Sequence, residues 1–287
     1  MGLPIVNDGM LRDSVPGTAP HEEEREIIKS NLALVRRKVG IISGKGGVGK
    51  TFVAVNLSLA IAAAGKRVGL LDADIDCPNV ARFLNLRDQP LSGSREGRIQ
   101  PLDHRGLRIV STHFLTDDSK APMIVRGPIK HKILAELLSN VDWGELDALI
   151  IDLPPGTADV PMSTMLLTGL DGVVVVTTPS KESLLDARKS ALMARDLKVP
   201  VLGVVENMAG DAFGSGAGKQ LADELGVPFL GTIPLSREIR ELSENGRAAL
   251  VEIDALVPAA QALVGVALGE AYRIFKKRSF WSRMLDR

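Results

Sequence analysis

The sequence predicts an α/β fold, a doubly wound and mostly parallel sheet with helices on both faces. The first observation is that short apolar runs typical of buried parallel strands alternate with helical patterns along the chain. The second is that the run at residues 39–42 leads straight into a glycine-rich segment, residues 44–51, which is followed by a long apolar helix pattern. The third is an apolar content of 45% over 287 residues, which is ample for one large core.

The individual elements follow from the spacing of the apolar residues. Strands are expected at residues 39–42, 67–71, 107–111, 148–151, 173–177, 201–205 and 228–233. Helices are expected within residues 21–36 and at residues 51–64, 129–141, 184–197 and 219–225. Residues 87–105 are polar, contain Pro, Gly and Ser, and carry no motif that we can interpret.

Residues 44–51 fit the pattern G-x-x-x-x-G-K-[ST] at every position, between a strand and a helix. Glycines let consecutive backbone N–H groups face phosphate oxygens, where a Cβ would collide. Lys50 supplies a charge for the β and γ phosphates, and the Thr51 hydroxyl is a hard oxygen suited to Mg²⁺. We therefore predict a P-loop NTPase that binds ATP or ADP rather than an ordinary glycine-rich turn. The expected nucleotide contacts are Gly44, Gly46, Gly47, Val48, Gly49, Lys50, Thr51 and Phe52.

Lys45 lies inside this loop, although the common motif does not require a lysine after the first glycine. No acidic residue near it in sequence offers a partner. A solvated surface lysine is the alternative interpretation, because lysines are usually exposed.

Carboxylates follow two of the expected strands at the edge where open α/β sheets bind ligands. Asp74 is our candidate to orient or deprotonate the attacking water, which makes Lys50 and Asp74 expected catalytic residues. Asp72 and Asp152 are expected to support the Mg²⁺ ion together with Thr51. The alternatives are acids that cap a helix starting near residue 78, and a rigid proline turn at residues 154–156.

Two further residues follow the last strands and are candidates for holding the nucleotide base. The side-chain amide of Asn207 could pair with a purine, and Pro234 could form the opposite wall. Turn chemistry explains the asparagine equally well.

Charge and cysteine content limit the classes of function. Thirty-five basic and thirty-five acidic residues cancel, so a nucleic acid partner is not expected. No stretch approaches the roughly 20 apolar residues of a spanning helix, and no secretory signal is visible at the N-terminus. The single cysteine, Cys77, excludes an intramolecular disulfide framework. We therefore expect a cytoplasmic protein.

The segments that carry this chemistry resemble the Mrp/ApbC family, whose members are ATPases of the ParA/MinD-like group with a deviant Walker A motif. The resemblance covers residues from about 25 to 250 and rests on residues 43–51, 70–79, 126–128, 143–159, 175–179 and 201–208. It implies ATP hydrolysis with Mg²⁺ and a homodimer in which Lys45 reaches the partner's nucleotide, which adds Lys45 to the expected catalytic residues. It also implies that Asn207 contacts the adenine and that the chain serves an iron–sulfur protein client.

The chain departs from the family at the site where cluster-bearing members place a Cys-x-x-Cys pair. That pair is expected soon after the Asn-Met at residues 207–208, but residues 209–218 contain no cysteine. A cluster that bridges two chains needs about four thiolates, whereas two copies of Cys77 provide two. We therefore expect that the chain does not hold an iron–sulfur cluster stably, although a carrier-like ATPase remains the first functional prediction.

The chain is expected to divide into three parts: an N-terminal extension with a short helix at residues 1–36, the P-loop ATPase domain at residues 37–255, and a C-terminal helix with a basic tail at residues 256–287. Residues 273–287 contain six basic residues and one acidic residue among several apolar ones. A MinD/ParA-like positioning ATPase that contacts a membrane surface with this tail is one alternative function. A scaffold that binds nucleotide without hydrolysing it is another.

Overall fold

The computed structural model describes residues 22–89, 92–93, 97–115, 127–157 and 159–245, together with Ala260. The predictions for residues 1–20, for Arg126 and for the basic residues 273–287 lie outside this part of the chain. None of the helices within the described residues has the length and apolar character needed to span a bilayer.

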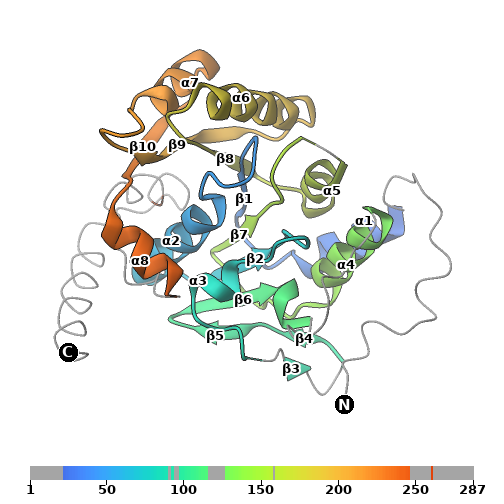
Figure 1. Cartoon of the computed structure of the whole chain (residues 1–287). Coiled ribbons are helices and arrows are strands. Elements are labelled where there is room, and N and C mark those ends of the chain that lie inside the picture. The colour runs from blue at the N-terminus through green and yellow to red at the C-terminus, as the bar shows by residue number, and fades with distance from the viewer. Residues whose placement is uncertain are drawn as a thin grey trace, which may run out of the picture.

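An eight-stranded sheet forms the centre of the molecule, with the strand order β10-β9-β8-β1-β7-β2-β6-β5 (Figure 1). Its strands are β1 (Lys38–Ile42), β2 (Val68–Asp72), β5 (Leu102–His104), β6 (Leu107–Ser111), β7 (Ala148–Asp152), β8 (Gly172–Thr177), β9 (Val201–Ala209) and β10 (Phe229–Pro234). Every pairing is parallel except that of β5 with β6. The predicted mostly parallel, doubly wound sheet is therefore confirmed.

Helices cover both sides of this sheet, with α2 on one side and α4 and α5 on the other (Figure 1). The helices are α1 (Glu22–Asn31), α2 (Lys50–Ala63), α3 (Val80–Phe83), α4 (Gly127–Asn140), α5 (Asp159–Thr168), α6 (Lys181–Asp196), α7 (Ala217–Leu225) and α8 (Arg237–Glu244), with a 3₁₀ helix at Thr112–Leu115. Strands β2, β7 and β8 are buried at every residue, as expected of strands covered on both faces.

Helix α1 packs against α4 and α5 and contributes Ile28 to the common core. The chain then runs through the buried residues Leu32 and Val35, and Val35 forms an isolated bridge with Leu146 before β1 begins. Ala260 is also fully buried in that core.

The structure differs from the sequence predictions in several segments, and two of its helices, α5 and α8, were not among those expected. Residues 87–105 contain β5 and the two short strands β3 (Ser92–Gly93) and β4 (Ile99–Gln100), which form a second sheet. Strands of two or three residues leave no periodic pattern to detect. The strand predicted at residues 201–205 continues to Ala209, with its polar residues buried: Asn207 bonds Val48, and Glu206 bonds N–H groups at residues 216 and 218.

Candidate functional site

The predicted phosphate loop and both groups of carboxylates meet at one edge of the sheet. Strand β1 lies between β7 and β8, and β7 lies between β1 and β2. Asp152 is in register with Ile41 on one side and with Asp72 on the other. The loop after β1 and the carboxylates that end β2 and β7 therefore share the carboxyl edge of three adjacent strands, where α/β sheets bind ligands.

Asp152 binds the two most specific residues of the loop at once. Its Oδ1 atom lies 2.6 Å from Lys50 Nζ, and its Oδ2 atom accepts a hydrogen bond of 2.6 Å from Thr51 Oγ1. The Lys50 side chain is 6% exposed and that of Asp152 is fully buried. Removing one partner of a buried ion pair leaves the charge of the other without compensation. An anion that binds the Lys50 ammonium group therefore has to compete with the Asp152 carboxylate.

The glycines of the loop are required for two different physical reasons. Gly47 and Gly49 have φ angles of +80° and +83°, which side chains rarely adopt. Gly44 needs to be glycine because a Cβ there would overlap the backbone of Asp186 in α6. A Cβ on Gly46 or Gly47 would meet nothing within 4 Å, so this side of the loop is open to a ligand.

Asp72 is completely buried and is held by three donors. Its carboxylate accepts hydrogen bonds from Val80 N and Ser111 Oγ at 3.0 Å and from Asp74 N at 3.2 Å. Burial raises the pKa of Asp72 to about 7, and the neighbouring carboxylate of Asp152 adds to the shift. Val80 is the first residue of α3, so Asp72 also takes part in the helix capping that we considered as an alternative.

Asp74 lies on the loop that follows β2, at the same edge of the sheet, and it is buried. Its Oδ1 atom accepts a hydrogen bond of 3.2 Å from Cys77 N. Burial raises the pKa of Asp74, while the charge of Lys50 acts in the opposite direction. A carboxylate with a raised pKa beside a phosphate-binding loop is a candidate for positioning or deprotonating a water molecule.

Lys45 is half-buried on the first turn of the loop, where Ser43 Oγ donates to its carbonyl at 3.0 Å. Within the described part of the chain, its ammonium group makes no hydrogen bond or ion pair. The lysine charge therefore remains available for a group that is not part of this chain.

The structure gives Asn207 a contact that the sequence did not predict. Its Nδ2 atom donates to the carbonyl of Val48 at 2.9 Å, and the residue is 4% exposed. Pro234, the other predicted base contact, is exposed and in register with Ala209. The contacts of these two residues with a purine remain predictions.

Phe52 cannot contact a nucleotide through its ring. The side chain is buried in the core, and its ring centroid lies 6.2 Å from that of Phe83. Only the backbone of Phe52 at the start of α2 remains available to the site.

The loop after β7 is joined by a backbone hydrogen bond to the residue that precedes the phosphate loop. Gly156 has a φ of +93°, and its N–H group donates to Ser43 O at 2.9 Å. A backbone donor without a ligand has to find another acceptor, and the residue before the phosphate loop supplies it. Ser43, which we did not predict as a site residue, therefore connects the two loops, and its position directly before the motif was the available signal.

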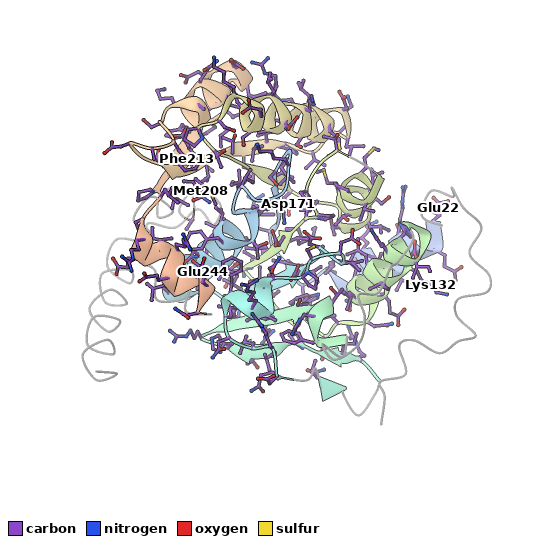
Figure 2. All side chains as sticks on the ribbon, viewed as in Figure 1. Glu22, Lys132, Asp171, Met208, Phe213 and Glu244 are labelled. Atoms are coloured by element: carbon purple, nitrogen blue, oxygen red, sulfur yellow. The ribbon has the colours of Figure 1, made fainter. Side chains whose placement is uncertain are left out.

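The cysteine-free segment after β9 forms a closed turn of its own. Gly210 and Gly214 exchange backbone hydrogen bonds of 3.0 and 2.7 Å. Buried Glu206, which the sequence analysis missed, accepts N–H groups of Gly216 and Gly218 at 2.9 and 2.7 Å, at the start of α7. Phe213 stands at the turn with 56% exposure (Figure 2).

The oxygen atoms at this edge of the sheet fit a hard cation whose coordination is completed by phosphate oxygens. Asp72, Asp152 and the Thr51 hydroxyl provide oxygen atoms of the kind that Mg²⁺ prefers. Across the described residues, no group of three or more His, Cys, Asp or Glu side chains could hold a metal alone. This result is expected for Mg²⁺, which usually takes one or two carboxylates plus substrate phosphates.

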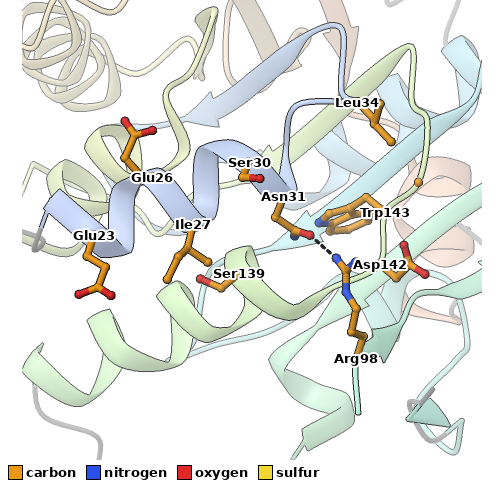
Figure 3. A pocket seen from close by; sticks show the side chains of 11 residues that line it. Glu23, Glu26, Ile27, Ser30, Asn31, Leu34, Arg98, Ser139, Asp142 and Trp143 are labelled. Atoms are coloured by element: carbon orange, nitrogen blue, oxygen red, sulfur yellow. Dashed lines mark hydrogen bonds between the residues drawn. The ribbon is translucent and has the colours of Figure 1, made fainter. Parts of the chain in front are cut away.

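A separate cavity of about 650 Å³ lies between α1, the end of α4 and Arg98 (Figure 3). Ile27, Asn31 and the buried Trp143 are among its lining residues, and Asn31 Oδ1 accepts a hydrogen bond from Arg98. It contains none of the loop residues or strand-end carboxylates. Its size therefore does not make it the site of the chemistry predicted here.

Residues 34–267 match the ParA family model described as the NUBPL iron-transfer P-loop NTPase. The chain belongs to this family. The iron-sulfur cluster carrier protein of Methanocaldococcus jannaschii is 43% identical over 231 residues, which are 76% of this chain and 79% of that protein. The family resemblance predicted from the motifs is thereby confirmed.

Solved structures agree with this membership. A nucleotide-binding protein of Archaeoglobus fulgidus in complex with ADP has a TM-score of 0.71 at 34% identity and covers 80% of this chain and 95% of its own. The septum site-determining protein MinD of Pyrococcus horikoshii, complexed with Mg-ADP, has a TM-score of 0.59 at 25% identity and covers 80% and 94%. This member of the NUBPL family is thus a P-loop ATPase, as predicted.

Proposed function

We propose that this chain is a Mg²⁺-dependent ATPase that acts as a homodimer in the cytoplasm and binds or releases an iron–sulfur apoprotein according to its nucleotide state. The observation that carries the proposal is the simultaneous pairing of Asp152 with Lys50 and Thr51 at 2.6 Å. These three residues have to be separated, at least in part, when phosphates enter the loop.

The arriving phosphates take Lys50 as a charge partner and thereby weaken its bond with Asp152. The Asp152 carboxylate and the Thr51 hydroxyl then become available as hard oxygen ligands for Mg²⁺. A bound Mg²⁺ would neutralise part of the phosphate charge. The exchange changes the end of β7, from which the loop at residues 153–157 begins.

Asp74 is the proposed catalytic carboxylate for the attacking water. Its burial and raised pKa suit a group that orients the water and accepts its proton as the oxygen attacks the γ-phosphorus. Because Asp74 Oδ1 also holds Cys77 N, a change at Asp74 is transmitted to the exposed segment around Cys77. This segment and residues 153–157 are the proposed client-responsive surfaces.

Lys45 supports the proposed homodimer. The described residues give its ammonium group no ion-pair partner, although Lys45 lies on the phosphate loop itself. A charge kept free beside the nucleotide is suited to the phosphates of a second chain.

The proposed role in iron–sulfur metabolism is restricted to the client. Relatives that match most of the chain are named iron-sulfur cluster carrier proteins. This chain offers one cysteine, exposed Cys77, and its turn at residues 209–218 has no thiolate. The proposal therefore assigns the iron–sulfur cluster to the client protein and not to this chain.

The proposal is tested by measuring ATP hydrolysis with and without Mg²⁺, and molar mass by light scattering with ATP or ADP. Lys45→Ala should lose the ATP-dependent dimer, whereas Lys66→Ala, a half-exposed lysine away from the loop, should keep it. A wild-type chain that remains a monomer with ATP, or that hydrolyses ATP equally well in chelator, contradicts the proposal.

A second candidate function follows from the basic residues 273–287, which carry a net charge of +5 together with Phe275, Phe280 and Trp281. Such segments bind anionic lipid surfaces through screened electrostatics and partial burial of aromatic side chains. Co-sedimentation with anionic vesicles that fades with salt would support this function. Equal sedimentation after deletion of residues 273–287 would exclude it.

A further inference from the structure

We infer that Asn207 is a positioning residue for the phosphate-binding loop and acts on every triphosphate ligand, whatever its base. The inference rests on the proposed nucleotide site and deepens it, because it assigns Asn207 a role that does not require a base. The observation is the buried hydrogen bond from Asn207 Nδ2 to Val48 O at 2.9 Å, which joins residues 159 positions apart in sequence.

The hydrogen bond fixes the orientation of the amide. A carbonyl oxygen can only accept, so the side chain has to present its NH₂ group to Val48. Among the hydrogen bonds of the described residues, none involves Asn207 Oδ1. One of the two N–H groups of the amide is therefore committed to the loop.

The same bond fixes the direction of a neighbouring N–H group. In a trans peptide the C=O and N–H groups point in opposite directions, and the described residues contain no cis peptide bond. When Asn207 holds the Val48 carbonyl, it therefore turns the Gly49 N–H group away from β9. Gly49 belongs to the glycines that present N–H groups to phosphate in this motif.

Close packing reinforces the hydrogen bond. A Cβ on Gly49 would overlap Asn207 Nδ2 and would lie 3.6 Å from Met208 Cε. Gly49 therefore permits β9 to approach the loop closely. At the other end of the loop, the backbone of Asp186 packs against Gly44 in the same manner.

Asn207 is carried by a strand that cannot easily shift. Its neighbour Glu206 pairs with Thr177 of β8, and Ala209 pairs with Pro234 of β10. Met208, the residue after Asn207, adopts a left-handed φ of +59°. Such a conformation is strained and persists where the surrounding structure determines it. A group held this firmly can preorganise the loop before a ligand arrives.

The experiment compares ligands with and without a base by titration calorimetry. Asn207→Ala should lower the affinities for ATP, GTP and inorganic tripolyphosphate by a similar factor of about ten, which is the effect of losing one buried hydrogen bond. Asn56→Ala is the matched control, because Asn56 is equally buried and donates to Phe52 O at 2.9 Å without touching Val48. It should lower thermal stability and leave the affinity for tripolyphosphate unchanged.

Asn207→Asp provides a second variant of nearly the same shape, which sets an acceptor against the Val48 carbonyl. It should lower the affinity for tripolyphosphate at least as much as Asn207→Ala does. Thermal unfolding without ligand shows whether each variant is folded. Loss of ATP affinity with unchanged tripolyphosphate affinity in both variants overturns the inference and leaves the nucleotide site standing. A wild-type chain that binds none of the three ligands overturns the proposed function itself.

Discussion

The phosphate loop and the turn after β9 are two glycine-rich segments with opposite designs. The phosphate loop gathers side chains from other strands, since Lys50 and Thr51 meet Asp152 and Val48 meets Asn207. The turn at residues 209–218 closes on itself through Gly210 and Gly214 and is anchored by Glu206. The phosphate loop is thus held by residues of β7 and β9, whereas the turn at residues 209–218 contains no thiolate for a soft metal.

The largest effect is expected at the loop. Lys50→Ala removes the charge that pairs with the phosphates, so the dissociation constant for ATP should rise at least about 100-fold. The measurement is calorimetric titration with ATP. Lys219→Ala, whose partner Asp223 lies on the surface of α7, is the control and should bind ATP normally. Unchanged ATP affinity in Lys50→Ala would show that Lys50 is not the charge partner of the phosphates.

Asp74→Ala should separate binding from hydrolysis. Removal of the proposed water-orienting carboxylate should lower turnover about 100-fold, while the loop contacts that hold ATP stay intact. Single-turnover hydrolysis and ATP affinity are measured on the same preparation. A variant with wild-type turnover would move the role to another carboxylate of this edge.

Two neighbouring glycines allow a matched test of the loop's packing. Gly44→Ala should lower the free energy of unfolding by about 2 kcal/mol, because its methyl group meets the rigid backbone of Asp186. Gly46→Ala, which meets nothing within 4 Å, should change it by no more than about 0.5 kcal/mol. Denaturant unfolding without nucleotide compares the two. Equal losses would show that packing against α6 is not the reason for glycine at residue 44.

The smallest effect is the pH dependence that comes from Asp72. Its pKa of about 7 in the folded chain exceeds the ordinary value of 3.8, so the folded state binds more protons between these values. Asp72 therefore makes the free energy of unfolding fall as the pH rises from about 4 to about 7. Asp72→Asn should remove this slope, because an amide does not titrate, and denaturant unfolding at several pH values measures it. A parallel pH profile for the two proteins would contradict the origin of the shift.

The part of the structure that could be predicted from sequence is the part encoded by local patterns. The run at residues 107–111 coincides with β6, and the motif at residues 44–51 placed Lys50 and Thr51 correctly at the start of α2. The carboxylates Asp72 and Asp152 could be placed at one edge because parallel strands end together. These inferences needed only the period of the apolar residues and the rule for ligand sites.

The remainder depends on contacts that leave no local signal. The partner of Asn207 is 159 residues away, and the overlap that requires glycine at residue 44 involves the backbone of Asp186. Glu206 looked like an ordinary charged residue, yet it is buried against N–H groups at the start of α7. In each case the sequence shows the residue, but only the folded chain shows what it contacts.

The most direct test of the central claim is anaerobic reconstitution with iron and sulfide, followed by desalting and measurement of iron per chain in the same sample that hydrolyses ATP. We expect Mg²⁺-dependent ATP hydrolysis with no iron retained, in wild type and in Cys77→Ser alike. The reason is that a bridging cluster needs about four thiolates. A stable cluster of about four irons per dimer that survives desalting, above all one that Cys77→Ser keeps, would contradict it.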